Sequence, residues 1–266
     1  MKTILVLLLF STLGFAQSRF DGTWVAKMDS VRLPSKPEIY QLQNGKYECE
    51  TCIPKISVPA DGNDHHVAGS PYFSSIAVRV VNHQNIQITE KQRGELVYSE
   101  TDSLSPDQNY LTEKISDSSA PRGEPVTAEE AFQRVGQTPP GANAISGSWQ
   151  AEKIVDVSSN ALTVTYLSIK DGLKASNPGG EGYSAKFDGK DYPIQGAPDH
   201  STVSLKRINA NTIVETDKLA GRPHYVLRLT ISHDGNSMRV TETDLERGTK
   251  TIFTMDKASS AQARVQ

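Results

Sequence analysis

Apolar and polar residues alternate with a period of two along several stretches of the second half of the chain. The clearest stretches are Ala161–Leu167 and Thr202–Leu205, and apolar side chains recur at every second position from Tyr225 to Ile231. This period, together with the many β-branched and aromatic residues, is typical of strands with one buried face. The pattern therefore predicts β-strands and no long helix in this part of the chain.

Short turn sequences separate these strands. Asp171-Gly172, Asp188-Gly189 and His233–Asn236 supply residues that tolerate left-handed backbone or form Asx turns. Because the connections are short, neighbouring strands should pair antiparallel in an up-and-down meander of about eight strands, and such a sheet removes its edges by closing into a barrel. The fold class that we predict is all-β.

The chain contains an internal duplication. Residues 61–117 align without a gap on residues 188–244, and 16 of the 57 positions are identical. The starts of the two copies also match, because Phe20–Trp24 resembles Ile145–Trp149. We therefore predict two tandem barrels, from residues 20–135 and 145–258, joined by a Pro- and Gly-rich linker over 136–144 and followed by a disordered tail over 259–266.

Residues 124–135 carry two conflicting signals. Thr127–Glu130 ahead of an apolar run, with Gly136 after it, is typical of a capped short helix that ends at a glycine. The repeat instead sets this segment against Thr249–Met255, which has the composition of a strand. We predict a strand, because the first copy otherwise lacks its closing element, and a helix remains the alternative.

The N-terminal residues predict a secretory signal peptide over 1–16. Lys2 precedes the apolar run Ile4–Phe10, and the small residues Gly14 and Ala16 fit a cleavage site before Gln17. The apolar run is too short to serve as a permanent transmembrane anchor, and no later stretch is apolar enough to be one. We expect export to the periplasm or beyond the cell.

Each copy opens with a Gly-x-Trp motif, at Gly22–Trp24 and at Gly147–Trp149. The motif resembles the one that begins the first strand of lipocalins and related calycin barrels, and the whole chain is similar to a family of duplicated lipocalin-like proteins exported by environmental bacteria. The resemblance implies barrels with an apolar interior and identifies no ligand. Within them we expect Trp24 and Trp149 to be structural, each at the base of its own copy's barrel with its indole N–H bonded to a carbonyl.

The only two cysteines, Cys49 and Cys52, are spaced as C-x-x-C. In an exported all-β chain this spacing favours a small structural disulfide over a redox site. A zinc site is the alternative, because His65 stands where a zinc finger has its third ligand; His66, however, follows on an extended segment, where adjacent side chains point apart. We predict the disulfide, no metal site and no cofactor.

The charge of the chain and its lack of catalytic motifs limit the classes of function that we expect. The formal net charge is −3 and the basic residues are scattered, which excludes a clustered basic face for nucleic acid. No nucleophile motif, phosphate loop or dinucleotide fingerprint is present, so we assign no catalytic residue. Carboxylate pairs contributed by distant strands leave no local trace, and an enzyme therefore remains the least favoured possibility.

The two copies differ at one run of positions. Tyr98, Glu100 and Asp102 stand where the second copy has Tyr225, Leu227 and Leu229. Residues two apart on a strand share a face, so the first barrel has an acidic patch in its interior if this face points inward, and could bind a cation or a polar ligand there. Solvent exposure of the face is the alternative, because buried unpaired carboxylates are costly. Tyr98, Glu100, Asp102 and Tyr225 are the candidate ligand-binding residues.

The function that we expect is an exported, non-enzymatic binding protein that holds a small, mainly apolar molecule in a barrel. The alternatives are a structural or interaction protein of the envelope or extracellular space with filled barrels, and a hydrolase or isomerase that uses scattered carboxylates. An open cavity inside a barrel would favour binding. The sequence leaves the ligand and the oligomeric state open.

Overall fold

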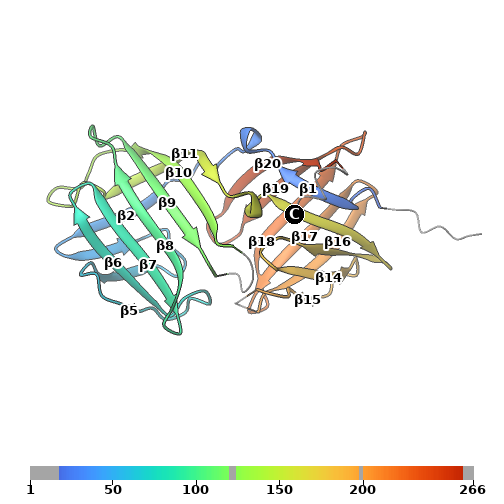
Figure 1. The fold of residues 1–266 in the computed structure, drawn as a ribbon, viewed down its shortest axis with the longest axis horizontal. Coiled ribbons are helices and arrows are strands. Elements are labelled where there is room, and N and C mark those ends of the chain that lie inside the picture. Colours follow the sequence, from blue (N-terminus) through green and yellow to red (C-terminus); the bar gives the residue numbers. More distant parts are fainter. Residues whose placement is uncertain (1–17, 120–123, 198–199, 260–266) are drawn as a thin grey trace, which may run out of the picture.

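The computed structural model describes residues 18–119, 124–197 and 200–259, and it consists of two antiparallel sheets of ten strands each. Each sheet curls into a nearly closed barrel, and the two barrels lie side by side (Figure 1). The predicted all-β class is confirmed, with ten strands per sheet where about eight were expected. The predicted signal peptide and nearly all of the predicted tail lie outside the described residues.

The first barrel has the strand order β4-β3-β2-β11-β10-β9-β8-β7-β6-β5. Its strands are β2 (Glu38–Gln43), β3 (Lys46–Cys49), β4 (Ile56–Pro59), β5 (His65–His66), β6 (Ser75–Asn82), β7 (Asn85–Gln92), β8 (Glu95–Leu104), β9 (Tyr110–Asp117), β10 (Val126–Val135) and β11 (Gly147–Val157). The segment with conflicting signals is thus the strand β10, as predicted, and it supplies one wall of this barrel.

The second barrel has the strand order β14-β13-β12-β1-β20-β19-β18-β17-β16-β15. Its strands are β1 (Gly22–Ala26), β12 (Thr163–Ile169), β13 (Gly172–Ser176), β14 (Gly182–Lys186), β15 (Tyr192–Pro193), β16 (Thr202–Asn209), β17 (Thr212–Leu219), β18 (Arg222–Ile231), β19 (Ser237–Asp244) and β20 (Thr249–Lys257). Two short 3-10 helices, η1 (Met28–Ser30) and η2 (Ser159–Ala161), follow β1 and β11.

The opening strands of the two copies are exchanged. β1 pairs with β12 and β20 of the second barrel, and β11 pairs with β2 and β10 of the first. Figure 1 shows the blue β1 among the orange and red strands of the second barrel. The expectation that Trp24 and Trp149 lie in the barrels of their own copies is therefore wrong, because Trp24 packs in the core of the second barrel and Trp149 in that of the first.

The predicted boundary over 136–144 is also wrong. This segment connects β10 to β11, which are neighbours in one sheet, and the ladder begins immediately beyond it with Val135 opposite Ser148. The chain instead passes between the barrels after β1 and again after β11. The physical reason is that β1 and β11 are near-equivalent strands, so the repeat alone does not determine which sheet each one completes.

The internal alignment, in contrast, is structural. Strands β5 to β9 and β15 to β19 have the same bounds after a constant shift of 127 residues. Register irregularities also recur at matching places, between Glu90 and Lys91 and between Asp217 and Lys218. The two copies therefore share one backbone, on which differences between side chains can be compared position by position.

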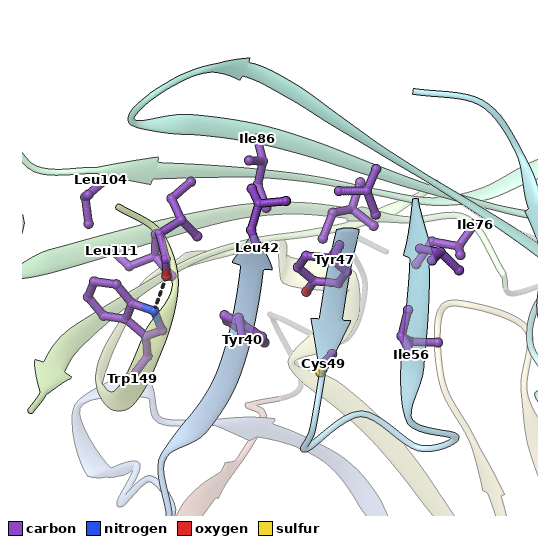
Figure 2. Close-up of a cluster of buried hydrophobic side chains, with 14 of the residues drawn as sticks. Tyr40, Leu42, Tyr47, Cys49, Ile56, Ile76, Ile86, Leu104, Leu111 and Trp149 are labelled. Atoms are coloured by element: carbon purple, nitrogen blue, oxygen red, sulfur yellow. Dashed lines mark hydrogen bonds between the residues drawn. The ribbon is translucent and has the colours of Figure 1, made fainter. Parts of the chain in front are cut away.

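The Gly-x-Trp motif has the same structural role in both barrels. The indole nitrogens of Trp24 and Trp149 each donate to the carbonyl oxygen four residues earlier, at 2.8 Å, and both rings are fully buried, as Figure 2 shows for Trp149. Gly22 and Gly147 have φ values of +128° and +145°, which favour glycine. A cation, Lys257 or Arg134, lies over each indole and fills the space that a Cβ at the glycine would take.

The predicted disulfide is confirmed, with Cys49 and Cys52 sulfurs 2.06 Å apart. Both thiols are consumed by this bond, so the zinc alternative has no thiolate ligand, and His65 contacts the Asp61 carboxylate at 2.8 Å instead. Ala175 stands opposite Tyr166 in β12–β13 as Cys49 stands opposite Tyr40 in β2–β3, and the second barrel folds without a bridge there.

Replacing both cysteines by serine is expected to leave the fold intact. The bond closes a very short loop, so its removal should lower the free energy of unfolding by at most about 2 kcal/mol. Denaturant unfolding of the double variant, followed by circular dichroism, measures this change. Loss of the native spectrum in the absence of denaturant would show that the bond is essential to the first barrel.

Among the described residues, no helix is long and apolar enough to cross a membrane.

Candidate functional site

One row of inward-facing positions distinguishes the two barrels. In the first barrel the row crosses β8, β9 and β10, where Asp102 lies opposite Glu113 and Glu113 lies opposite Glu130. In the second barrel the corresponding row across β18, β19 and β20 is Leu229, Val240 and Phe253. Along this row the same backbone therefore presents acidic side chains in one barrel and apolar side chains in the other.

Three carboxyl groups converge inside the first barrel. Each of Glu100, Asp102 and Glu113 offers an oxygen atom that lies within 4.8 Å of those offered by the other two. Asp102 is 1% exposed and Glu113 is 5% exposed, and neither carboxylate oxygen of Asp102 has a donor group as its partner. We call Glu100, Asp102 and Glu113 the acidic cluster.

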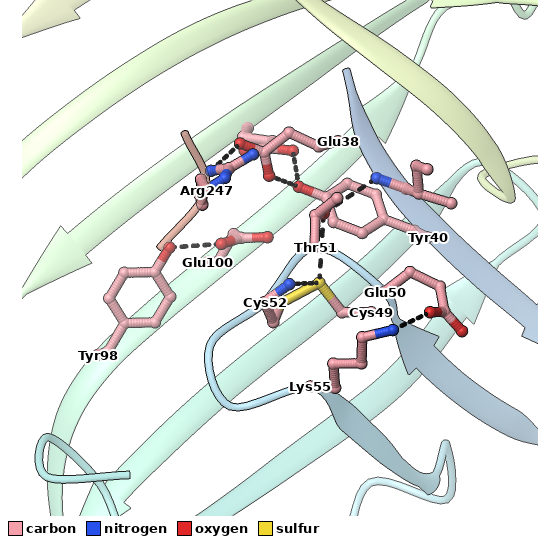
Figure 3. The surroundings of a disulfide bond; sticks show 12 residues. Glu38, Tyr40, Cys49, Glu50, Thr51, Cys52, Lys55, Tyr98, Glu100 and Arg247 are labelled. Carbon is pink, nitrogen blue, oxygen red and sulfur yellow. Dashed lines mark hydrogen bonds and ion pairs between the residues drawn. A yellow bond between two sulfur atoms is a disulfide. The ribbon is translucent and has the colours of Figure 1, made fainter. Parts of the chain in front are cut away.

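A hydrogen-bonded rim adjoins the acidic cluster, and Figure 3 draws part of it, with Glu38, Tyr40, Tyr98, Glu100 and Arg247 labelled. The Tyr98 hydroxyl donates to Glu100, and the Tyr40 hydroxyl lies 3.2 Å from the Glu113 carboxylate and 2.6 Å from that of Glu38. Glu38 in turn accepts from the Arg247 guanidinium at 2.9 Å. Arg247 belongs to the turn between β19 and β20, so the second barrel supplies a cation to this rim.

Burial governs the protonation of the acidic cluster. It raises the pKa of Asp102 and of Glu113 well above their usual range, and the charge of Glu100 adds to both shifts. Burial also raises the pKa of Glu100, which shares a hydrogen bond with Asp102 when one of the two holds a proton. Three adjacent carboxylates are mutually repulsive, so the cluster is stable only with protons or with a bound cation.

The second barrel contains an open cavity of about 530 Å³. Much of its wall is formed by apolar side chains, which include Val164, Leu227, Leu229, Val240, Phe253 and Met255. Acidic residues line it as well, namely Asp117, Glu181, Glu215, Asp217 and Glu242. Residues of the first barrel's β9 and β10 and of η2 complete the lining at one end. This volume lies within the range of small-molecule sites in proteins.

A polar group stands at one side of this apolar cavity. The Tyr183 hydroxyl donates to the Glu215 carboxyl at 2.6 Å, and both side chains line the cavity. Burial, followed by the nearby charge of Asp217, raises the pKa of Glu215 to about 8. Near neutral pH this pair therefore presents a neutral carboxyl group and a phenol to the cavity, whereas other carboxyl groups, including that of Asp217, also line it.

The four candidate residues fall into two separate places. Tyr98, Glu100 and Asp102 lie together inside the first barrel, so the inward-facing alternative of the sequence analysis describes the geometry. Tyr225 lies in the second barrel, where it lines a smaller cavity of about 190 Å³ next to the large one. Burial, followed by the charge of Asp244, raises the pKa of Tyr225 to about 12.

Several residues of both interiors were missed. Glu113 and Glu215 could have been found, because the gapless alignment sets them against Val240 and Ile88 as clear exchanges between acidic and apolar residues. Glu38 and Arg247 had no such signal. Glu38 lies outside the aligned segment, and Arg247 reaches the first barrel from the second copy.

Two comparisons with known proteins find no relative of this chain. A scan against models of protein families finds no match to the chain, and a search of curated proteins also finds none.

Proposed function

We propose that this chain is an exported binding protein that holds a small, mainly apolar molecule in its second barrel. The observation that carries the proposal is the cavity of about 530 Å³ with an apolar wall. An interior filled by side chains, as a purely structural barrel requires, would have no such space. Export rests on the N-terminal sequence, and a lipocalin-like use of the barrel rests on the resemblance at the two Gly-x-Trp motifs.

The chemistry of the wall defines the class of ligand. Leu227, Leu229 and Phe253 offer apolar contact to a hydrocarbon or aromatic body. The Glu215–Tyr183 pair offers hydrogen bonds to one neutral polar group, because Glu215 holds its proton near neutral pH. The ligand that we propose therefore has an apolar body and one polar end, and it carries no negative charge, because further acidic side chains line the cavity.

Binding of a neutral fluorescent probe, N-phenyl-1-naphthylamine, tests the proposal. The intact protein is expected to bind one molecule with a rise in probe fluorescence. Leu227→Trp places a larger side chain in the cavity and should weaken binding at least about tenfold, because well-packed space does not accommodate added volume.

Leu167→Trp is the matched control. It adds the same side chain to β12 at a position that is 51% exposed, and binding should be unchanged. Equal affinity in the intact protein and Leu227→Trp would place the probe elsewhere. Absence of binding in the intact protein would favour the alternative of a structural or interaction protein.

A further inference from the structure

The acidic cluster has no structural role that the fold requires. Leu227, Leu229 and Val240 occupy the equivalent positions of the second barrel and are compatible with the same backbone. Burying carboxylates costs free energy unless they are paired, and among the described residues the two oxygens of the buried Asp102 have no partner other than the neighbouring carboxyl group of Glu100. Such a group is explained by a ligand that supplies positive charge.

We propose that Glu100, Asp102 and Glu113 bind a single hard divalent cation, with calcium as the expected ion. This site is independent of the apolar cavity in the second barrel. It also replaces our expectation from the sequence that the chain has no metal site.

The geometry favours a metal ion over an organic cation. The three carboxyl groups offer oxygens within 4.8 Å of one another, which is the span of ligands around one central atom. An ammonium group on a carbon chain would require an adjoining space for that chain. The Tyr40 hydroxyl, 3.2 Å from Glu113, adds a further oxygen at the edge of the cluster.

The types of ligand favour calcium among the divalent ions. All the donors are oxygens, whereas zinc prefers nitrogen and sulfur. Magnesium demands near-ideal octahedral geometry and retains several waters, whereas calcium accepts six to eight oxygens, including bidentate carboxylates. Three carboxyl groups that each offer two oxygens meet that requirement in a small buried space.

A route to the cluster begins at the junction of the barrels. A cavity of about 420 Å³ there is lined by residues that include Arg247, Glu246 and Glu50. Arg247 also contacts Glu38, whose carboxylate shares the Tyr40 hydroxyl with Glu113. Arg247 therefore links this cavity to the edge of the acidic cluster, and its ion pair with Glu38 leaves the charge of the cluster unbalanced.

Isothermal titration of the full mature protein with calcium chloride near neutral pH, after treatment with a chelator, tests the proposal. We expect one calcium ion per chain and a rise in melting temperature on binding. The triple variant Glu100→Leu, Asp102→Leu and Glu113→Val, which copies the second barrel, should lose both effects and should remain folded without calcium. Asp102→Asn should weaken binding at least about tenfold, because the number of charged ligands sets calcium affinity.

Glu215→Gln is the matched control, since it removes a buried carboxyl group from the other barrel; calcium binding should be unchanged. Two results would overturn the proposal. The first is the absence of heat and of any thermal shift with calcium, magnesium or manganese. The second is binding of equal affinity in the triple variant, which would place the ion on the surface. Probe binding in the second barrel is measured separately and does not depend on either result.

Discussion

Trp24→Ala is expected to destabilise the second barrel and to leave the first barrel protected, although Trp24 belongs to the first copy in sequence. The indole is fully buried in the second core, and truncation of a buried tryptophan costs about 3–5 kcal/mol. Hydrogen exchange read by mass spectrometry should show faster exchange in β12 to β20 and unchanged exchange in β3 to β9.

Trp149→Ala should have the opposite effect, with faster exchange in the first barrel. Val155→Ala, on the same strand β11 but 48% exposed, is the control and should change little. If Trp24→Ala instead loosened β3 to β9, the strand exchange would be refuted.

Fragments of the chain extend this prediction. A fragment from Leu33 to Ser158 contains every strand of the first barrel and should fold alone. A fragment from Ile145 to Ala258, which is the second copy as it appears in sequence, lacks β1 and should not reach a stable barrel. Addition of residues 18–32 at either end of this fragment, through a flexible linker, should restore cooperative unfolding.

The second prediction with a large expected effect concerns how the stability of the protein depends on pH. With a chelator present, the protein is expected to lose stability as the pH rises from about 5 to about 8. Buried carboxyl groups hold protons in the folded state that the unfolded chain releases, since the pKa values of Glu215 and Glu90 are each raised, chiefly by burial, to about 8. Folding then takes up protons over this interval, and the stability that is present below the unfolded pKa is lost as the pH approaches the folded value.

Glu215→Gln isolates one contribution. Because one pKa unit corresponds to about 1.4 kcal/mol, Glu215 alone accounts for a loss on the order of 4 kcal/mol, and the variant should show a shallower decline. Denaturant unfolding at pH values across this interval measures the slope. Glu95→Gln, at the exposed first residue of β8, should keep the slope of the intact protein. A stability that rises with pH would contradict the assignment of these groups as buried and protonated.

Much of the fold could be predicted from the sequence alone, because strand positions and strand faces are determined by patterns among neighbouring residues. Alternation fixes the strand faces, and the gapless alignment fixed β5 to β9 against β15 to β19, so β10 could be predicted as a strand against a helix signal. The exchange of β1 and β11 could not be predicted. Both strands carry Gly-x-Trp behind a buried residue, Phe20 or Ile145, and each therefore satisfies either barrel.

The residues of the candidate site could likewise be predicted only in part. Glu100 and Asp102 could be identified because they replace leucines of the second copy on one face of the strand, although the sequence left open whether this face points inward. The Arg247–Glu38 ion pair joins a turn of one copy to a strand of the other, and the alignment holds no information on contacts between copies. The volume of the cavity likewise depends on the curvature of a ten-stranded sheet, and this curvature cannot be predicted from local sequence patterns.

The position of β1 has a consequence for the order in which the molecule matures. Trp24 pairs with Lys257, roughly 230 residues later, whereas every strand of the first barrel has been synthesised once Val157 has left the ribosome. Domains that are complete early generally fold first during synthesis, so the first barrel closes while β1, the earliest strand to emerge, has β12 as its next partner but still lacks β20. Any event that stops synthesis before β20 leaves β1 with the edge that β20 would cover unpaired, beside a finished first barrel, and this edge is open to pairing with other chains.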